Sequence, residues 1–457
     1  MSLVEVKDKL DKVGCGFCLA KWTQVTMHLS MGMTHSCHHP APHKVNEKEV
    51  KRNPSALHNT RFKKLKRKEM LENKRPSECN YCWNVEDNSD SFSDRVFKSS
   101  EDWSLPEYDK IKNLNWREDY NPKYVEVAFS NTCNFKCAYC GPQFSSKWVE
   151  EIEKKGPYKL SHDYNNLEQL KAKNEMPYKK TEYNPYVDAF WEWWPELYND
   201  LHTFRITGGE PLLSKDTFKV LDHIIKAEEP NKNLSLSINS NLGVPDSLID
   251  KFISKAKVIC EEDRVKELVI YTSVEATGNQ AEYTRFGLKY DKFWSNLEKI
   301  LSELPKVNVV IMSTFNALSV FTYGDLIDKV FEVKKKFSSN TRYNPSALSL
   351  DTSYLRWPSH MSVQILEEEH KDLILESAKK ALYYGMKEYS SENYGFTNME
   401  IQKIKRIYDY AKGHSVMFDV EKNRKDFIKF VMQYDERRGT DFIKTFPELK
   451  NMYVKYS

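Results

Sequence analysis

Three closely spaced cysteines follow a segment whose pattern predicts a β-strand. Residues 124–129 (Tyr-Val-Glu-Val-Ala-Phe) alternate in polarity as strands do. Cys133, Cys137 and Cys140 come soon after them with Cys-x3-Cys-x2-Cys spacing. We therefore expect the three thiols on a loop at the carboxyl end of a strand, where open α/β folds place their chemistry.

The number of thiols in this loop limits what they can hold. Thiolates are the usual protein ligands of iron–sulfur clusters, and a four-iron cluster takes one ligand for each iron. Three cysteines would leave one iron free to bind a substrate or a cofactor. Zinc sites usually pair cysteines in two separated halves, and unrelated thiols rarely cluster in a chain with 9 cysteines in 457 residues. A zinc site and three unrelated thiols are the alternatives.

Five more cysteines lie in the first hundred residues. Cys15 and Cys18 form one Cys-x2-Cys pair, Cys79 and Cys82 form another, and Cys37 stands between the pairs beside several histidines. Two separated pairs suit a structural zinc ion, yet a zinc ion or a four-iron cluster would leave one thiol over. The count alone leaves both metals open. In a reducing compartment, a clustered and odd set of thiols favours metal binding over disulfides.

Composition and charge argue against several classes of protein. The mean hydropathy of −0.68 and the 30% of charged residues predict a soluble chain. No apolar run is long enough for a membrane span, and residues 1–11 are charged and lack a signal-peptide core, so we expect a cytoplasmic protein with no membrane partner. A net charge of only +3 gives no global case for nucleic acid as a partner. The basic run at residues 63–68 is interpreted as a solvated helix face.

Strand and helix patterns alternate after the cysteine loop, which indicates an α/β fold with a parallel sheet. With residues 124–129 there are six predicted strands, the others being at residues 202–207, 234–241, 268–275, 307–314 and within 347–355. The predicted parts of the chain are a cysteine-rich domain (1–100), a linker (101–120), the sheet domain (121–355) and a mainly helical C-terminal extension (356–457).

The second predicted strand runs into Gly208-Gly209-Glu210-Pro211. Two glycines permit close backbone approach and unusual torsions, and proline then ends the ladder. A Gly-Gly pair alone is usually only a turn. Placed after the second strand behind a Cys-x3-Cys-x2-Cys loop, it resembles the signature of the radical SAM superfamily, whose Gly-Gly-Glu-Pro motif binds the amino group of S-adenosylmethionine (SAM).

The resemblance implies both a fold and a chemistry. Radical SAM enzymes contain a partial (β/α)6 barrel, which is more open than the closed eight-stranded barrel. By this resemblance, Cys133, Cys137 and Cys140 hold a [4Fe-4S] cluster whose open iron is chelated by SAM. Reductive cleavage of SAM then yields a 5'-deoxyadenosyl radical, which abstracts hydrogen from a substrate.

The resemblance also implies further contacts with SAM. Asn239, Ser240 and Asn241 lie where related enzymes contact the ribose of SAM, although the same residues would suit an ordinary strand-to-helix turn. Arg285 resembles the arginine that binds the SAM carboxylate, a role that suits the bidentate guanidinium. Glu275 stands where relatives often have aspartate. The SAM-binding residues implied in this way are Gly208, Gly209, Glu210, Asn239, Ser240, Glu275 and Arg285.

The N-terminal cysteines resemble a twitch domain, a shortened relative of the SPASM domain that carries one auxiliary [4Fe-4S] cluster. Residues 21–29 alternate like a strand and open a predicted hairpin that closes near Gly32, and residues 44–73 predict a charged helical connector. Twitch domains familiar from radical SAM enzymes usually follow the catalytic domain, whereas these cysteines precede it. The ligands implied by the resemblance are Cys18, Cys37, Cys79 and Cys82, with Cys15 left over.

Two functional hypotheses follow. In the first, the chain is a radical SAM enzyme, an oxidoreductase or one that modifies a peptide or small molecule, and its auxiliary cluster relays electrons or binds substrate. Peptides, sugars, nucleosides and amino acid derivatives are all open as substrates, and a flavodoxin or ferredoxin is the expected electron donor. In the second, a zinc-stabilised noncatalytic protein binds RNA or protein, with residues 63–68 as the RNA contact. That hypothesis requires the cysteine loop, the Gly-Gly pair and Arg285 to be coincidental, so we favour the enzyme.

Overall fold

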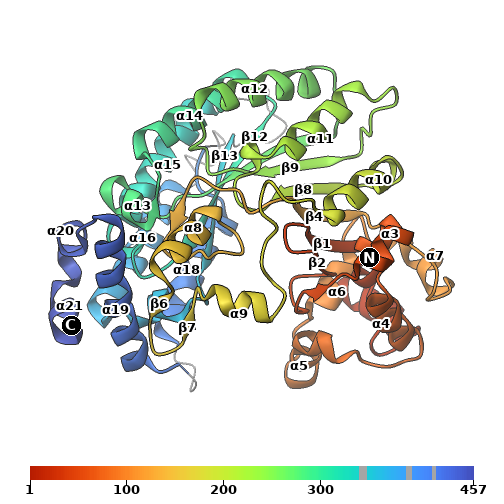
Figure 1. Cartoon of the computed structure of the whole chain (residues 1–457), viewed down its shortest axis with the longest axis horizontal. Coiled ribbons are helices and arrows are strands. Elements are labelled where there is room, and N and C mark those ends of the chain that lie inside the picture. The colour runs from red at the N-terminus through yellow and green to blue at the C-terminus, as the bar shows by residue number, and fades with distance from the viewer. Residues whose placement is uncertain (339–346, 387–393, 414–417) are drawn as a thin grey trace.

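A nine-stranded, mostly parallel sheet connects the two cysteine-rich parts of the chain (Figure 1). The structure is a computed structural model that describes residues 1–338, 347–386, 394–413 and 418–457. The strand order is β13-β12-β10-β9-β8-β4-β1-β2-β3, in which β2 and β3 are antiparallel to their neighbours and the other pairs are parallel. The strands are β1 (Gln24–His28), β2 (Met33–His35), β3 (His43–Lys44), β4 (Tyr124–Ala128), β8 (Thr203–Thr207), β9 (Ser235–Asn239), β10 (Glu267–Thr272), β12 (Asn308–Phe315) and β13 (Leu348–Tyr354).

Six consecutive parallel strands, from β4 to β13, confirm the predicted α/β class and agree with a partial barrel. Parallel neighbours need crossover connections, and helices supply each of them. The main crossover helices are α8 (Ser146–Lys155), α10 (Pro185–Asp200), α11 (Lys215–Lys226), α12 (Asp246–Glu261), α14 (Tyr290–Glu303) and α15 (Tyr323–Phe337). In Figure 1, α11, α12, α14 and α15 form an arc along the outer side of the sheet.

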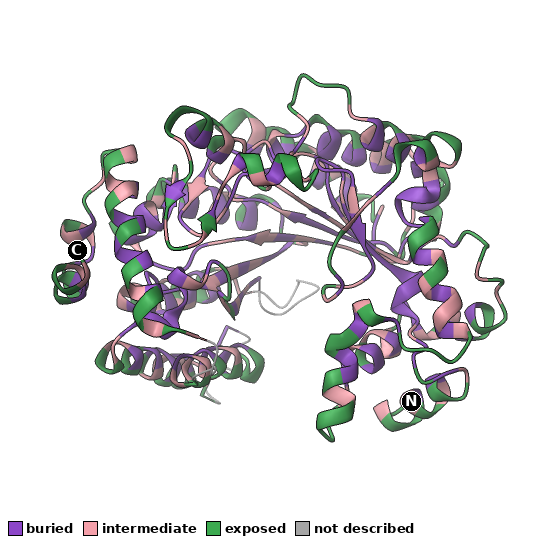
Figure 2. Cartoon of the chain, turned by 60° about the horizontal axis from the view of Figure 1, so that its bottom comes forward, coloured by how far each residue is buried: buried purple, intermediate pink, exposed green. Residues whose placement is uncertain are grey.

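The two faces of the sheet differ in polarity because side chains alternate along each strand. Val125, Phe204 and Ile206 are buried in the hydrophobic core on the helix-covered side. Residues between them, such as Glu126 and Arg205, are less buried and face the opposite, concave side. Figure 2 shows this alternation of purple and pink along the strands. The concave face therefore offers polar groups to a ligand.

The N-terminal hairpin belongs to the same sheet. The predicted hairpin is confirmed, since β1 and β2 pair in antiparallel fashion. In addition, β1 pairs in parallel with β4 and places Thr26 opposite Glu126, so the cysteine-rich region extends the sheet directly. The helices of this region are α1 (Leu3–Asp11), α2 (Ala20–Thr23), α3 (Glu47–Arg52), α4 (Arg61–Leu71), α5 (Asn80–Asn88), α6 (Asp94–Ser100) and α7 (Tyr108–Lys112). Helix α7 lies within the predicted linker and buries Tyr108 in the N-terminal core.

The basic run at residues 63–68 lies on α4, and its interpretation as a solvated helix face is wrong for two members. Lys63 is 1% exposed and Arg67 is 0% exposed. They are four residues apart and so lie on one face of the helix, which is turned into the N-terminal region. Lys64, Lys66 and Lys68 on the other faces remain at least partly exposed.

Short elements and the C-terminal extension complete the fold. The remaining strands and short connecting helices are β5 (Lys136–Cys137), β6 (Tyr158–Lys159), β7 (Asp163–Tyr164), β11 (Arg285–Phe286), α9 (Leu167–Ala172) and α13 (Gly278–Thr284). The extension is mainly helical where it is described, with α16 (Glu368–Tyr384), α18 (Asn398–Lys412), α19 (Val420–Arg438), α20 (Phe442–Thr445) and α21 (Lys450–Tyr456). The 3-10 helices are η1 (Pro54–Leu57), η2 (Ser77–Cys79), η3 (Leu105–Glu107), η4 (Pro211–Leu213), η5 (Val320–Thr322), η6 (Ser359–Met361), η7 (Val363–Ile365) and η8 (Pro447–Leu449).

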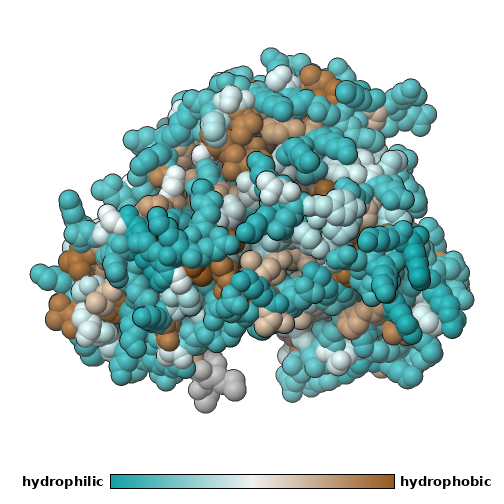
Figure 3. Space-filling model, in the orientation of Figure 1, coloured by the Kyte–Doolittle hydropathy of each residue, from teal (hydrophilic) through white to brown (hydrophobic). Residues whose placement is uncertain are grey.

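The surface is largely polar. Hydrophilic side chains cover most of the face shown in Figure 3, and hydrophobic ones form small separate patches. Within the described residues, no helix combines the length and the apolar character that crossing a membrane requires.

Candidate functional site

Two short strands outside the main sheet hold the cysteine loop. Cys137 lies on β5, which pairs in antiparallel fashion with β11 and places Cys137 opposite Arg285. The backbone N–H of Cys133 donates to Ser146 Oγ (3.2 Å), in the first turn of α8. The loop is thus fixed at its start by a helix and in its middle by a two-stranded ribbon.

Gly208 and Gly209 bring the end of β8 against the cysteine loop. Gly208 has a φ of +117°, and a Cβ on it would lie 2.7 Å from the carbonyl oxygen of Ser130. A Cβ on Gly209 would lie 2.3 Å from the carbonyl oxygen of Thr132, and the Gly209 N–H donates to the Ser130 carbonyl (3.1 Å). Only glycine permits this approach without displacing backbone.

One pocket joins the cysteine loop to most of the residues implied as SAM contacts. It opens at the carboxyl ends of β8 and β9, where parallel sheets bind their ligands. Its lining includes Cys133, Cys137, Cys140, Gly208, Gly209, Asn239, Ser240, Asn241, Ser273 and Arg285. The structure therefore gathers three thiols, a glycine turn and a guanidinium from distant parts of the sequence around one space.

Glu210 lies behind this pocket and ties its walls together. Its carboxylate is buried and accepts hydrogen bonds from Leu212 N–H (2.9 Å), Ser240 Oγ (2.9 Å) and Asn241 N–H (2.6 Å). Burial raises the pKa of Glu210 to about 7, and the three hydrogen bonds partly oppose that rise. The carboxylate thus connects the turn after β8 with the end of β9.

Arg285 and Glu275 form a buried ion pair at the side of the cysteine loop. Arg285 Nε and Nη2 both lie against Glu275 Oε2, at 2.8 and 2.7 Å. Arg285 Nη1 lies 3.8 Å from Cys137 Sγ. Burial raises the pKa of Glu275, which the positive charge of Arg285 opposes. Glu275 therefore orients the arginine whose remaining nitrogen faces the thiol.

Burial raises the pKa of all three loop thiols, and for Cys140 it reaches about 12. For Cys137, the charge of Arg285 acts against the effect of burial. Because metals bind thiolates, loading this loop would release protons. These three side chains are therefore a fitting donor set for a thiophilic metal centre and poor nucleophiles without one.

Four of the five N-terminal cysteines line one cavity. Cys18, Cys37, Cys79 and Cys82 surround about 410 Å³ of space, counting its open mouth. Cys15 is exposed, and its N–H donates to Asn73 Oδ1 (2.7 Å) away from this cavity. The structure thus brings together the four thiols implied as ligands and leaves apart the one implied as spare.

Buried basic side chains lie in and beside this cavity. Lys21, which lines it, is 3% exposed and is paired with Glu78. Lys63 Nζ donates to Thr34 Oγ1 (3.1 Å), and burial together with the charges of Arg67 and Lys21 lowers its pKa well below the ordinary value. Buried cations are costly unless an anion compensates them.

Two histidines of the hairpin lie between the two cysteine sites. His28 Nε2 and His35 Nε2 are 3.2 Å apart, and His35 Nδ1 lies 2.5 Å from the Cys37 carbonyl. Because a carbonyl only accepts, His35 Nδ1 carries a proton, and His35 Nε2 then accepts from His28. His28 Nδ1 is left as a buried acceptor with no partner among the described residues. The ring of His28 packs against Phe144, which lines the loop pocket.

These histidines, and Arg205 beside Asn239, were not predicted as site residues. Arg205 Nε donates to Asn239 Oδ1 (3.0 Å) on the concave face. Their only sequence signal is position: His28 and Arg205 stand on strands whose alternate residues are apolar. That alternation could have placed them on the polar face, but not beside a particular neighbour.

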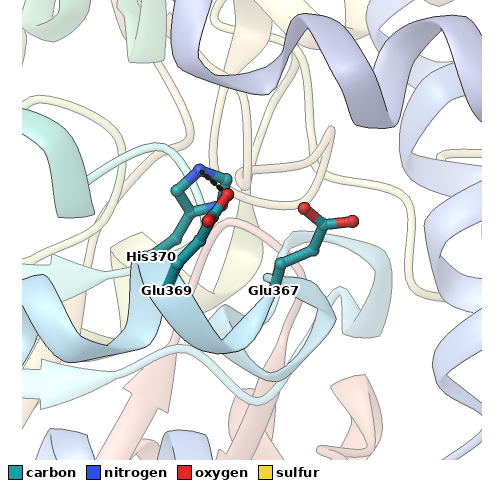
Figure 4. Close-up of side chains that lie close together, drawn as sticks. All are labelled: Glu367, Glu369 and His370. Carbon is teal, nitrogen blue, oxygen red and sulfur yellow. Dashed lines mark ion pairs between the residues drawn. The ribbon is translucent and has the colours of Figure 1, made fainter.

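A third group of potential metal ligands lies at the start of α16. Glu367, Glu369 and His370 have ligand atoms within 4.8 Å of one another, and a 3.7 Å ion pair joins His370 to Glu369 (Figure 4). Figure 4 shows the Glu367 side chain standing apart from that pair. His370 Nδ1 is buried without a partner among the described residues, but its side chain is 13% exposed. Acidic groups of this kind are common without an ion, so the group carries no assignment.

Comparison with known proteins agrees with the geometry of the loop site. Residues 127–317 match the sequence model of the radical SAM superfamily. Two curated relatives are GTP 3',8-cyclases of Clostridium botulinum, from strain Okra / Type B1 and strain Hall / ATCC 3502 / NCTC 13319 / Type A. Each is 25% identical, over 279 and 284 residues respectively, which cover 60% of this chain and 72% of the relative. The matched family region contains the three loop cysteines, the Gly-Gly-Glu-Pro turn, Glu275 and Arg285, and begins after the N-terminal cysteines.

Proposed function

The chain belongs to the radical SAM superfamily, and on that premise we propose that it is an enzyme with two [4Fe-4S] clusters that abstracts hydrogen from a polar substrate. The observation that carries this proposal is the single pocket shared by Cys133, Cys137, Cys140, the Gly208-Gly209 turn and Arg285. Three thiolates would hold a four-iron cluster and leave one iron open. When bound there, the cluster and SAM supply a 5'-deoxyadenosyl radical.

Different residues of the pocket are suited to bind different parts of SAM. The glycine turn presents backbone without side chains, so an amino acid moiety can approach it closely. Arg285, held in place by Glu275, offers guanidinium N–H donors to a carboxylate, and Asn239, Ser240 and Asn241 offer polar groups to a ribose. Glu210 positions this wall through its three hydrogen bonds rather than by facing the pocket.

The N-terminal cavity supports a second cluster in a twitch-like domain. Four thiols surround it, which matches the ligand number of a closed four-iron cluster. The hydroxyl of Ser36 lines the cavity and is buried with no partner in the described structure, so it could donate to a cluster sulfide. The buried Lys21 and Lys63, which both lie near Cys37, would be compensated by an anionic cluster.

The concave face between the two centres is the proposed substrate site. His28 offers an unpartnered acceptor and Arg205 a guanidinium, so the face suits a substrate rich in hydrogen-bonding groups. The names of the relatives make a nucleotide one candidate, alongside the sugars, nucleosides, amino acid derivatives and peptides. The second cluster would accept an electron from the substrate radical or bind the substrate, which makes an oxidation or a peptide or small-molecule modification the expected class.

We propose a reduced flavodoxin or ferredoxin as the electron donor and the cytoplasm as the compartment, where thiols remain reduced. The test is anaerobic incubation of the iron-loaded chain with SAM and dithionite, with detection of 5'-deoxyadenosine. We expect cleavage by the parent, its loss in Cys137→Ala, and an increase when a true substrate is added. Absence of 5'-deoxyadenosine from a fully iron-loaded parent would contradict the proposal.

A further inference from the structure

A helix from the C-terminal extension covers the ribbon that carries Cys137. The ribbon consists only of β5 and β11, and two-stranded units are marginally stable alone. On α19, Tyr434 donates to the carbonyl of Tyr283, and Asp435 accepts from Tyr283 OH (2.9 Å). These contacts hold the segment that leads into β11. The extension is thus joined to the cysteine loop although it lies far away in sequence.

Arg438, one turn further along α19, reaches the other strand of the ribbon. Its side chain is 0% exposed. Nη1 donates to the carbonyl of Lys136 (2.6 Å), the residue before Cys137. Nε and Nη2 donate to Glu151 on α8, at 3.0 and 3.3 Å. A single guanidinium therefore connects α19, β5 and α8.

Glu151 completes a charged group around this segment. It also accepts from Lys136 Nζ (2.6 Å) and from Tyr158 OH (2.9 Å). The guanidinium of Arg438 lies over the ring of Trp148 (4.7 Å), whose Nε1 donates to the Cys137 carbonyl (3.0 Å). Arg438 therefore binds the Lys136 carbonyl directly, and Trp148, which Arg438 contacts, binds the carbonyl of Cys137 itself.

We propose that Arg438 is a positioning residue of the iron–sulfur loop, and that Arg438 and Glu151 set the charge felt by the cluster on Cys133, Cys137 and Cys140. The C-terminal extension would then tune the reduction potential of that cluster. A nearby positive charge favours the reduced, more negative cluster, and a negative charge favours the oxidised one. This inference rests on the proposed function, because it requires the loop to hold a redox cluster.

The test compares Arg438→Met, Arg438→Lys and Glu151→Gln in the full-length chain. An anaerobic redox titration followed by electron paramagnetic resonance gives the midpoint potential of the signal that changes on addition of SAM. We expect the potential to fall in Arg438→Met, to rise in Glu151→Gln and to stay near the parent value in Arg438→Lys. Loss of packing alone would not shift two neighbouring variants in opposite directions.

Arg437 provides the matched control. It lies on the same helix and bonds the carbonyls of Gly156 (2.9 Å) and Pro157 (3.0 Å), so it joins α19 to the chain after α8 without contacting the cysteine ribbon. Arg437→Met should leave the potential unchanged. Equal potentials in Arg438→Met, Glu151→Gln and the parent, or shifts of the same sign, would overturn the inference. If Arg438→Met does not take up iron, the midpoint potential of Glu151→Gln still tests the inference: a rise above the parent value supports it, and no rise overturns it.

The two proposals fail in distinguishable ways. A parent chain with no SAM-sensitive signal after iron loading would contradict the proposed function itself. If the parent has that signal but its midpoint potential does not change in Glu151→Gln or Arg438→Met, only the proposed role of the C-terminal extension is contradicted.

Discussion

The two cysteine sites differ in how closed they are, and this difference suggests a division of labour. The loop site has three thiols beside an open pocket lined by glycines and polar side chains. The N-terminal site has four thiols around a cavity set among buried side chains. A three-ligand site can take an external ligand, whereas a four-ligand site is complete by itself. The first suits chemistry on a bound molecule and the second suits electron transfer or structure.

The two cysteine sites also differ in whether the buried cations near them have carboxylate partners. At the loop site the nearest cation, Arg285, is already neutralised by Glu275. At the N-terminal site Lys21 has a partner in Glu78, but Lys63, which lies near Cys37, has no carboxylate within ion-pair distance in the described structure. The N-terminal site therefore gains more from an anionic occupant than the loop site does.

The largest expected effect separates the two sites by activity. Cys137→Ala should reduce SAM cleavage to the background of iron-free protein, because the open-iron site is lost. Cys37→Ala should remove iron from the N-terminal site while substrate-independent SAM cleavage continues. Production of 5'-deoxyadenosine is the measurement, and Cys15→Ala is the control that should retain both iron and activity. Equal loss of SAM cleavage in Cys37→Ala and Cys137→Ala would contradict the different roles proposed for the two sites.

A smaller effect is expected at the glycine turn. In Gly209→Ala the new Cβ would meet the Thr132 carbonyl at 2.3 Å, so the cysteine loop must move away from the turn. Misplacement by about 1 Å can cost roughly 100-fold in rate, and we expect a loss of that order in SAM cleavage. In Gly324→Ala the new Cβ has its nearest neighbour at 3.5 Å, so activity should be unchanged. An active Gly209→Ala would show that the close approach is dispensable.

Glu210 gives a pH-dependent prediction. Its pKa is raised from 4.5 to about 7, so its contribution to folding is fully present below pH 4.5 and is lost as the pH rises through 7. A shift of this size corresponds to on the order of 3 kcal/mol. Glu210→Gln stays uncharged. The unfolding free energy of the metal-free parent, relative to this variant, should therefore fall by that order between pH 4.5 and 8 in urea titrations. A constant difference would contradict the buried placement of Glu210.

The smallest effect concerns the N-terminal site alone. Ser36→Ala removes a hydroxyl that lines the cavity and has no partner in the described structure. Because hydrogen bonds to cluster sulfurs raise reduction potentials, the SAM-insensitive signal should move to a lower potential. Ser100→Ala is the control, since Ser100 is only partly buried, does not line the cavity, and bonds the Phe97 carbonyl. An unchanged potential in Ser36→Ala would contradict a hydrogen bond from this hydroxyl to the cluster.

Local pattern was sufficient for much of the fold. Short alternating runs predicted six strands, and the structure has a parallel strand at each of those positions. Sequence patterns do not predict contacts between residues that are far apart in the chain. The pairing of β1 with β4 depends on residues about a hundred positions apart, and the burial of Lys63 and Arg67 depends on what packs over α4.

The same limit applies to the site. The glycines and the three loop cysteines are recognisable because their spacing is local, and the structure places them around one pocket. Arg438 contacts the Lys136 carbonyl across 302 residues, and the sequence predicted only a mainly helical extension around it. No periodicity marks one buried arginine among many surface ones. The His28–His35 contact is also a property of the hairpin register rather than of the residues alone.

The most direct test of the account is the iron and sulfide content of the anaerobically reconstituted chain. It is measured beside a Cys133→Ala, Cys137→Ala, Cys140→Ala variant and a Cys18→Ala, Cys37→Ala, Cys79→Ala, Cys82→Ala variant. Two independent four-iron clusters predict about eight irons in the parent and about four in each variant. About four irons in the parent and almost none in the loop variant, with zinc bound elsewhere, would make the N-terminal site structural. That result would contradict the proposal that this chain carries two redox centres.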